Sequence, residues 1–274
     1  MKNFLYILAA AICLCACSNI EEDDRLAEVG FLPAKHIKRN VLVEDFTGQR
    51  CPNCPTAASL IEKLEAGYSN KAAGYDEAVI AVAIHSGNMG KGDLFHKVAQ
   101  DGQHFFDLLN DPNLPQPAAQ VSRASEVFTG NAVTANLHKS IRELLAQETP
   151  VEILDAVVKS GAEAGSYDIA FNVSSQEDLD VAVQVWAIES GVVSYQSMPD
   201  GSRNNEYVHN SVFRKSLTEL DGTQSSLKKN APVAYTYNFM PAADWKADNM
   251  AMVIIVSKPG GEVLQVKKVP LTAK

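Results

Sequence analysis

The spacing of the apolar residues changes near Pro150, and this change limits the folds that the chain can adopt. Before it, apolar runs at residues 40–46 and 78–84 predict two buried strands, with a helical stripe at residues 56–68 between them. Strand, helix and strand over this distance form a βαβ unit, which is typical of a parallel sheet covered on both faces. Beyond Pro150, apolar and polar residues alternate with period two, which predicts strands. We therefore expect an α/β region followed by an all-β region.

The predicted elements divide the chain into two domains. A strand at residues 118–121 and a helix at residues 132–147 complete the first domain, which we expect to span residues 35–149. The second domain is expected at residues 150–274. Its predicted strands lie at residues 151–158, 167–174, 180–189, 207–216, 233–239, 250–257 and 262–269. Short strands separated by turns rich in Gly, Pro and Asp are typical of an immunoglobulin-like β-sandwich.

The first 16 residues are typical of a lipoprotein signal peptide. Lys2 precedes an apolar run at residues 4–14, which has the length of a secretory signal and is too short to span a bilayer. The residues that follow, "LCAC", resemble a bacterial lipobox with cleavage before Cys17. This resemblance implies diacylglycerol on the Cys17 sulfur and a third acyl chain, palmitate, on its amino group, which together anchor a protein stably. The alternative is an ordinary secretory signal with incidental cysteines.

An acidic stretch, Glu21 to Asp24, follows this anchor within residues 17–34. It has two interpretations, a flexible tether and a signal for export to the cell surface of the kind found in Bacteroidota lipoproteins. The formal net charge is −9 and no basic cluster is present. Phosphate binding needs clustered Lys and Arg, so nucleic acid is not an expected partner.

Two of the five cysteines remain after maturation, Cys51 and Cys54 in the sequence "CPNC". They form the one possible intramolecular pair, in a compartment where disulfides persist. A redox pair, half of a metal site and a structural disulfide are the three interpretations. No other cysteine survives and the six histidines show no short ligand spacing, so neither a metal nor another cofactor is expected.

The residues around the pair favour redox chemistry. Cys51 is predicted at a helix N-terminus with Pro52 at the first helical position, and unpaired backbone N–H groups there favour a thiolate. Arg50 adds a positive charge beside it. Cys54, one turn further on, is placed to resolve a mixed disulfide.

The stretch "VLVEDFTGQRCPNCP" resembles the active-site entry of thioredoxin-like proteins. The resemblance implies that Asp45 relays protons to the second cysteine and that Pro117 is a cis-proline beside the disulfide, with Pro115 as the competing candidate. A strand-end carboxylate with a solvated head is the alternative for Asp45. Thioredoxins have Trp where Arg50 stands and Gly-Pro between their cysteines, so the redox potential and substrate preference do not transfer.

Three stretches together, "FTGQRCPNCP", "AIESGVVSYQ" and "NEYVHNSVFR", resemble outer-membrane lipoproteins of Bacteroidota that join a thioredoxin-like to an immunoglobulin-like domain. The resemblance implies a lipid-anchored outer-membrane protein that exchanges disulfides with exported protein thiols and disulfides. The alternative is a non-enzymatic surface-binding or adhesive lipoprotein with a structural disulfide, whose sandwich binds an unknown partner.

Other residues are interpreted as structural. His85 ends a predicted strand, where a hydrogen-bonded histidine is a more common occurrence than a catalytic one. Tyr207 and Arg214 are expected at an interface or in the core, and His209 is assigned no chemistry. The two tryptophans, Trp186 and Trp245, are expected in the core of the sandwich.

The lipobox generates the first prediction. Replacing Cys17 with Ser removes the sulfur that would carry the lipid, so the Cys17→Ser protein should leave the membrane fraction and appear in the soluble fraction. Immunoblotting of the fractionated cells measures this. A processed Cys17→Ser protein that stays with the membranes would contradict the lipobox.

Overall fold

The computed structural model describes residues 36–69, 77–95 and 100–272. They belong to one compact unit, His36–Lys274. The predicted signal peptide, the lipidation site at Cys17 and the tether at residues 17–34 lie outside the described residues and stay predictions. In the described part of the chain, no helix is both long enough and apolar enough to cross a membrane.

The first half of the chain forms its elements close to the places that its apolar pattern predicts. They are β1 (Val41–Thr47), α3 (Cys54–Tyr68), β2 (Val79–His85), α4 (Gly87–Gly90), α6 (Asp101–Asp107), β3 (Ala118–Val121), β4 (Phe128–Thr129) and α7 (Asn131–Leu145). β1 is buried along its whole length, as expected for a strand covered on both faces. α3 buries Ala57, Ile61 and Leu64, which are spaced so that they share one face of the helix.

The second half consists of strands and one short 3₁₀ helix. They are β5 (Val151–Ser160), β6 (Tyr167–Ser175), β7 (Leu179–Glu189), β8 (Val192–Ser197), β9 (Arg203–His209), β10 (Val212–Ser216), β11 (Thr223–Leu227), β12 (Val233–Phe239), η2 (Ala247–Asn249), β13 (Met250–Ser257) and β14 (Val263–Pro270). The single strand predicted at residues 207–216 is two strands, because Ser211 has a φ of 51° and redirects the chain between them. The sequence pattern misses β8 and β11, whose many polar residues hide the period of two.

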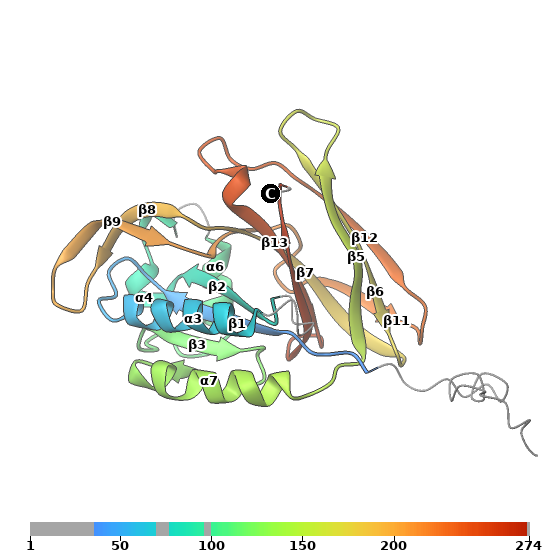
Figure 1. Cartoon of the computed structure of the whole chain (residues 1–274), viewed down its shortest axis with the longest axis horizontal. Coiled ribbons are helices and arrows are strands. Elements are labelled where there is room, and N and C mark those ends of the chain that lie inside the picture. Colours follow the sequence, from blue (N-terminus) through green and yellow to red (C-terminus); the bar gives the residue numbers. More distant parts are fainter. Residues whose placement is uncertain (1–35, 70–76, 96–99, 273–274) are drawn as a thin grey trace, which may run out of the picture. The chain divides into compact units, whose positions relative to one another are not determined.

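Strands from both halves form one nine-stranded mixed sheet (Figure 1). Its order is β14-β13-β7-β10-β2-β1-β3-β4, and β11 pairs with β7. β1 and β2 are parallel, and β1 and β3 are antiparallel. The halves join where β10 runs parallel to β2, with Val212 opposite Ala83. A three-stranded sheet, β12-β6-β5, and a two-stranded hairpin, β8-β9, complete the topology.

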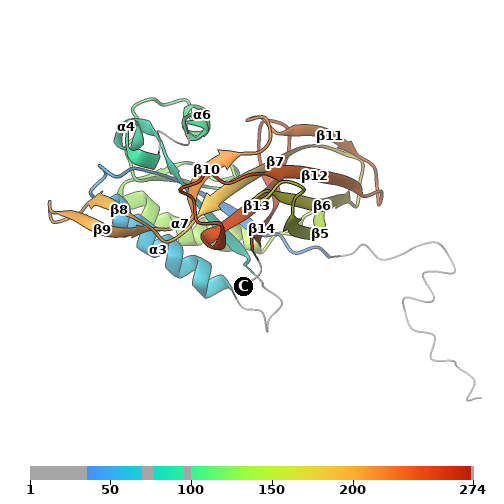
Figure 2. The ribbon, with the colours of Figure 1, turned by 90° about the horizontal axis from the view of Figure 1, so that it is seen from above.

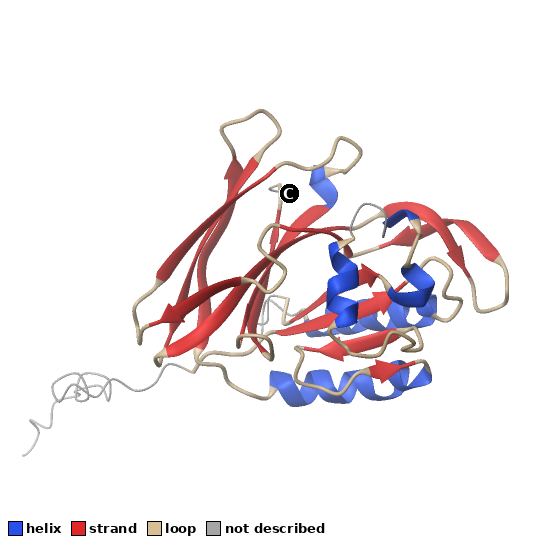
Figure 3. Ribbon diagram, turned by 180° about the vertical axis from the view of Figure 1, so that it is seen from behind, coloured by secondary structure: helices blue, strands red, loops and turns tan. Residues whose placement is uncertain are grey.

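The predicted fold class, an α/β thioredoxin-like domain followed by an all-β immunoglobulin-like sandwich, is wrong. The described chain has fourteen strands and four α-helices, and its largest sheet takes strands from both halves. Figure 3 shows that strands predominate over helices. The spacing of apolar residues along the chain identifies strands, but it does not show which distant strands pair. β7, β10 and β13 therefore looked like parts of a separate sandwich, although they extend the sheet that β1 and β2 begin. The boundary between residues 149 and 150 stays a prediction.

Different elements pack against the two faces of the large sheet. One face is packed by α3 and α7 over β1, β2 and β3, and by the three-stranded sheet over β7 and β13. The other face carries a core that both halves share, and α6 packs against it. Figure 2 shows α4 and α6 on one side of the strands and α3 and α7 on the other. Trp186 of β7 lies in the shared core, with its ring centroid 4.4 Å from that of Phe105 in α6.

The shared core generates a prediction about cooperativity. Trp186 is fully buried between the two halves, so Trp186→Ala should lower the free energy of unfolding by about 3–5 kcal/mol. The wild-type protein should unfold in one transition, because neither half keeps its packing without the other. Calorimetry and urea unfolding measure both expectations.

The matched control is Trp245→Ala, which removes a partly buried tryptophan outside the shared core and should destabilise the protein less. Two well-separated transitions in the wild-type protein, with Trp186→Ala affecting one of them alone, would mean that the two halves fold independently.

Candidate functional site

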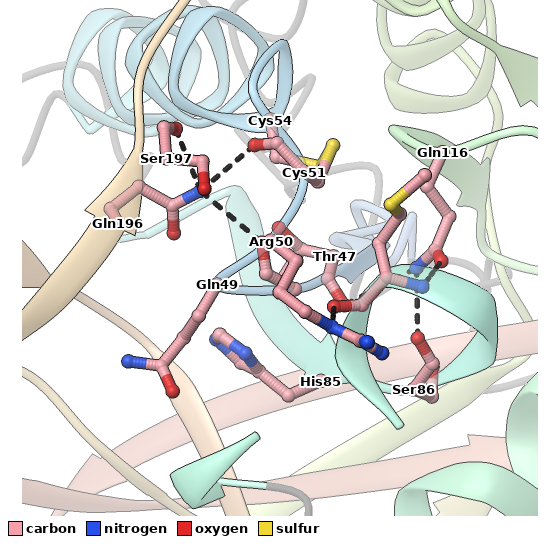
Figure 4. Close-up of a disulfide and its surroundings, with 12 residues drawn as sticks. Thr47, Gln49, Arg50, Cys51, Cys54, His85, Ser86, Gln116, Gln196 and Ser197 are labelled. Atoms are coloured by element: carbon pink, nitrogen blue, oxygen red, sulfur yellow. Dashed lines mark hydrogen bonds between the residues drawn. A yellow bond between two sulfur atoms is a disulfide. The ribbon is translucent and has the colours of Figure 1, made fainter. Parts of the chain in front are cut away.

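Cys51 and Cys54 form a disulfide at the turn that leads from β1 into α3 (Figure 4). The turn is held by a hydrogen bond from the Cys51 N–H to the Gly48 carbonyl at 3.0 Å. α3 begins at Cys54 with Asn53 as its N-cap, so the prediction that Cys51 lies at the helix N-terminus with Pro52 as its first residue is wrong by two residues. Cys51 and Cys54 are only 1% and 2% exposed. The disulfide is therefore buried rather than presented to solvent.

Arg50 does not direct its charge at the disulfide. Its guanidinium donates to the carbonyls of Asn88 and Lys91, each at 2.8 Å, at the end of the short helix α4. In Figure 4 the side chain points away from the two sulfur atoms. The preceding Gly48 is required by close packing, because a Cβ there would overlap the backbone of Met89 and Gly90. Arg50 and Gly48 thus fix the turn against α4.

Asp45 lies on β1 and is 4% exposed, so the interpretation as a solvated carboxylate is wrong. Its Oδ1 has no hydrogen-bond partner among the described residues. Asp45 and Cys54 line the same pocket of about 50 Å³, which is large enough for a water molecule. Burial raises the pKa of Asp45 from 3.8 to about 7, because the charged carboxylate loses its hydration there.

Pro117, and not Pro115, follows a cis peptide bond, as the sequence resemblance implied. The preceding side chain, Gln116, holds this segment in place. Its amide donates to the carbonyls of Thr47 and Ser86 at 3.2 and 3.0 Å, at the ends of β1 and β2 (Figure 4). The cis-proline segment is thereby tied to the strand ends beside the disulfide turn. The roles predicted for Pro117 and Asp45 in catalysis stay predictions.

The β8–β9 hairpin is the part of the site that the sequence pattern missed. Gln49, fully buried, donates to the Ser194 hydroxyl at 2.9 Å and to the Tyr195 carbonyl at 2.8 Å. In the opposite direction, the Gln196 amide donates to the Cys51 carbonyl at 2.8 Å and to the Gly48 carbonyl at 3.2 Å. The stretches "AIESGVVSYQ" and "NEYVHNSVFR" carry much of this hairpin, so their resemblance to a family was a signal for it.

Two histidines, His85 and His209, line the same pocket as Cys54. The His85 Nδ1 is 2.7 Å from Asp93 Oδ2, so His85 is the hydrogen-bonded strand-end residue that the sequence suggested. Its ring centroid is 4.4 Å from that of Phe95 and 5.6 Å from that of His209. Burial, followed by the nearby His85, lowers the pKa of His209 to about 4. His209 is therefore neutral at physiological pH and helps to pack the hairpin base.

The described residues hold no group of three or more His, Cys, Asp or Glu side chains that could bind a metal ion. They do contain a larger cleft of about 440 Å³ at the other face of the sheet. Its floor includes the ion pair between Arg123 and Glu44, at 2.9 Å, and its walls include Phe105 and Leu109. This volume lies in the range of small-molecule sites.

Comparison with known proteins gives one family match and a shared fold. A family model described as outer membrane protein Omp28 matches residues 114–274. HBP35 of Porphyromonas gingivalis is similar in structure, with a TM-score of 0.68 and 15% identity over 86% of this chain and 76% of that one. A domain of the outer membrane lipoprotein Omp28 from Porphyromonas gingivalis aligns with a TM-score of 0.30 and 18% identity, over 45% of this chain and 89% of that one. No curated protein sequence matches the chain.

The buried Asp45 generates a prediction about pH. Its folded-state pKa of about 7 exceeds the value of 3.8 for an unfolded chain, so the folded state binds the proton more tightly. The stability that this proton gives the folded state is complete below about pH 4 and is lost as the pH rises from about 4 to about 7, at roughly 1.4 kcal/mol per pH unit. Asp45→Asn cannot ionise and should be more stable than the wild-type protein at pH 8 but not at pH 4.

Urea unfolding of both proteins from pH 4 to pH 8 measures this. The other titrating groups are common to both, so the difference between the two curves isolates Asp45. Parallel curves would mean that Asp45 has an ordinary pKa in the folded protein.

Proposed function

The chain belongs to the Omp28 family of outer membrane proteins, and from this we propose that it acts by binding at the outer membrane, with Cys51–Cys54 as a structural disulfide. Membership in the family confirms the predicted localisation in the outer membrane. The lipid on Cys17 remains part of the proposal as the anchor. The partner class is a ligand or protein outside the cell envelope that contacts surfaces other than the sulfur atoms.

One observation carries this proposal, the burial of both cysteines. Thiol–disulfide exchange starts when a thiolate attacks a disulfide sulfur, so it needs an accessible sulfur atom. Cys51 and Cys54 are 1% and 2% exposed, and the turn between them is held by α4 on one side and by Gln196 of the hairpin on the other. In this arrangement the disulfide fixes a turn on which two other elements are packed. The cleft beside Arg123 is one surface with room for a small ligand.

A second candidate function, exchange with exported protein thiols and disulfides, is favoured by Asp45. Its carboxyl group lines the same pocket as Cys54, and a pKa of about 7 suits a group that gives and takes a proton near neutral pH. In that function Cys51 would attack the substrate, Cys54 would resolve the mixed disulfide and Pro117 would shape the substrate edge.

Alkylation and trapping separate the two functions. If the disulfide is structural, both thiols of the gently reduced protein should react equally slowly with iodoacetamide at mildly acidic pH, where an ordinary thiol of pKa about 8.5 is protonated. A Cys54→Ser protein expressed in cells should trap no mixed disulfides with exported proteins. Mass spectrometry and non-reducing gels measure both.

The control is Cys51→Ser, which cannot form the mixed disulfide in either function. Fast alkylation of Cys51 alone, together with partners trapped by Cys54→Ser and not by Cys51→Ser, would overturn the binding proposal and establish exchange.

A further inference from the structure

We propose that Gln49 and Gln196 are positioning residues that dock the β8–β9 hairpin on the Cys51–Cys54 turn, so that the docked hairpin and the disulfide stabilise each other. This inference goes beyond the function proposed above, because it holds for a structural and for a catalytic disulfide alike. It assigns a role in positioning the disulfide turn to two buried glutamines and to the hairpin that carries one of them.

The contacts are reciprocal and lie along one short loop. Gln49 reaches from the loop to the hairpin, and Gln196 reaches from the hairpin back to the loop. The N–H of Ser197 also donates to the Gln49 carbonyl at 2.9 Å. Gln196 is 2% exposed, and its amide is one of two donors to each of the carbonyls of Gly48 and Cys51, which also accept from the backbone N–H groups of Cys51 and Cys54. If Gln196 withdrew, each carbonyl would lose one of these two hydrogen bonds in a dry environment. The hairpin makes no strand pairing with the rest of the described chain, so these hydrogen bonds are its polar attachment to the loop.

The docked hairpin also lines the pocket of Asp45. Tyr207 and His209 of β9 form its wall, opposite Cys54 and Pro55 of α3. At the base of the hairpin, the Asn210 amide donates to Glu62 of α3 at 2.7 Å. If the hairpin moves away, water reaches Asp45. The solvation of Asp45 therefore reports whether the hairpin is docked.

Reduction of the disulfide should disturb this docking. Reduced dithiothreitol gives two electrons and two protons to the disulfide, so that the S–S bond breaks, Cys51 and Cys54 become thiols, and dithiothreitol closes its own disulfide ring. The two sulfurs must then move from a covalent bond to van der Waals separation. Both are buried, so the turn has to shift, and the turn carries the carbonyls that Gln196 and Ser197 bind.

Linkage makes the effect reciprocal. If the hairpin docks more tightly on the oxidised turn, then weakening the docking must make the disulfide easier to reduce by the same factor. Couplings of this kind are typically about 5- to 150-fold.

The test uses Gln196→Leu, with Gln265→Leu as the matched control. Gln265 is also a buried glutamine, 6% exposed, and its amide donates to two backbone carbonyls, those of Lys38 and Val151, away from the disulfide. In a dithiothreitol redox buffer, Gln196→Leu should shift the Cys51–Cys54 equilibrium toward the dithiol by at least about fivefold. Gln265→Leu should leave it at the wild-type value.

A second measurement detects docking without a redox step. Carbon-13 NMR of the Asp45 carboxyl group should show its pKa falling from about 7 toward the ordinary 3.8 in oxidised Gln196→Leu, and staying near 7 in Gln265→Leu. A substitution that lowers the stability of the protein without undocking the hairpin would leave the pKa of Asp45 unchanged.

The wild-type protein gives a third measurement if Gln196→Leu does not fold. Hydrogen exchange at the Ser197 amide should be at least about fivefold faster in the reduced than in the oxidised protein, with amides of β6 unchanged. Equal exchange in the two forms would overturn the coupling. So would a Gln196→Leu protein that keeps the wild-type equilibrium with dithiothreitol and the wild-type Asp45 titration.

Discussion

The fold depends on the junction between β2 and β10, where strands from the two halves pair in the large sheet. The Ala83 N–H donates to the Ser211 carbonyl at 2.8 Å, and Val212 stands opposite Ala83. This short contact joins a strand of the first half to a strand from beyond residue 200 in one sheet. The hairpin β8–β9 lies between β7 and β10 in the chain, so both its ends are fixed to that sheet. Its base is thereby held beside the end of β2, next to the turn that carries Cys51.

This arrangement leaves the carboxyl group of Asp45 buried, which is unfavourable when the group is charged. The hairpin and α3 both line the pocket around this carboxyl group, which is 4% exposed, and burial raises its pKa to about 7. A carboxylate whose Oδ1 has no hydrogen-bond partner in the described structure is destabilising when charged. A buried carboxyl group with an unpaired oxygen does not help to stabilise a core, so Asp45 is the strongest argument that the pocket has a use. Its proximity to Cys54 fits exchange, whereas the burial of both sulfurs fits a structural bridge. The alkylation and trapping experiment decides between them because it tests access to sulfur directly.

The sequence could predict what depends on neighbours in the chain. The apolar runs locate β1, β2 and β3, the helical stripe locates α3, and the cysteine count leaves Cys51 and Cys54 as one pair. It could not predict pairing between distant strands, which is why a tandem of two domains was expected instead of a shared sheet. Asp45 was identified only through a resemblance, and the pocket that it lines also includes Tyr207 and His209, more than 160 residues away. Gln49 and Gln196 lie in stretches that carry the family resemblance, but their burial has no local signal, since a buried glutamine and an exposed one look the same in a sequence.

Cys51 and Gln196 are far apart in the sequence but in contact in the fold, and this limits which function can be inferred from the motif "CPNC" alone. In the folded chain, the carbonyl of Cys51 accepts a hydrogen bond from a residue of the second half, and the wall opposite Cys54 comes from β9. The chemical environment of the disulfide is therefore a property of both halves together. A comparison restricted to the turn and α3 would omit the groups that bury the sulfurs and Asp45. Any activity transferred from the motif alone would assume an exposed disulfide, whereas both cysteines are buried here.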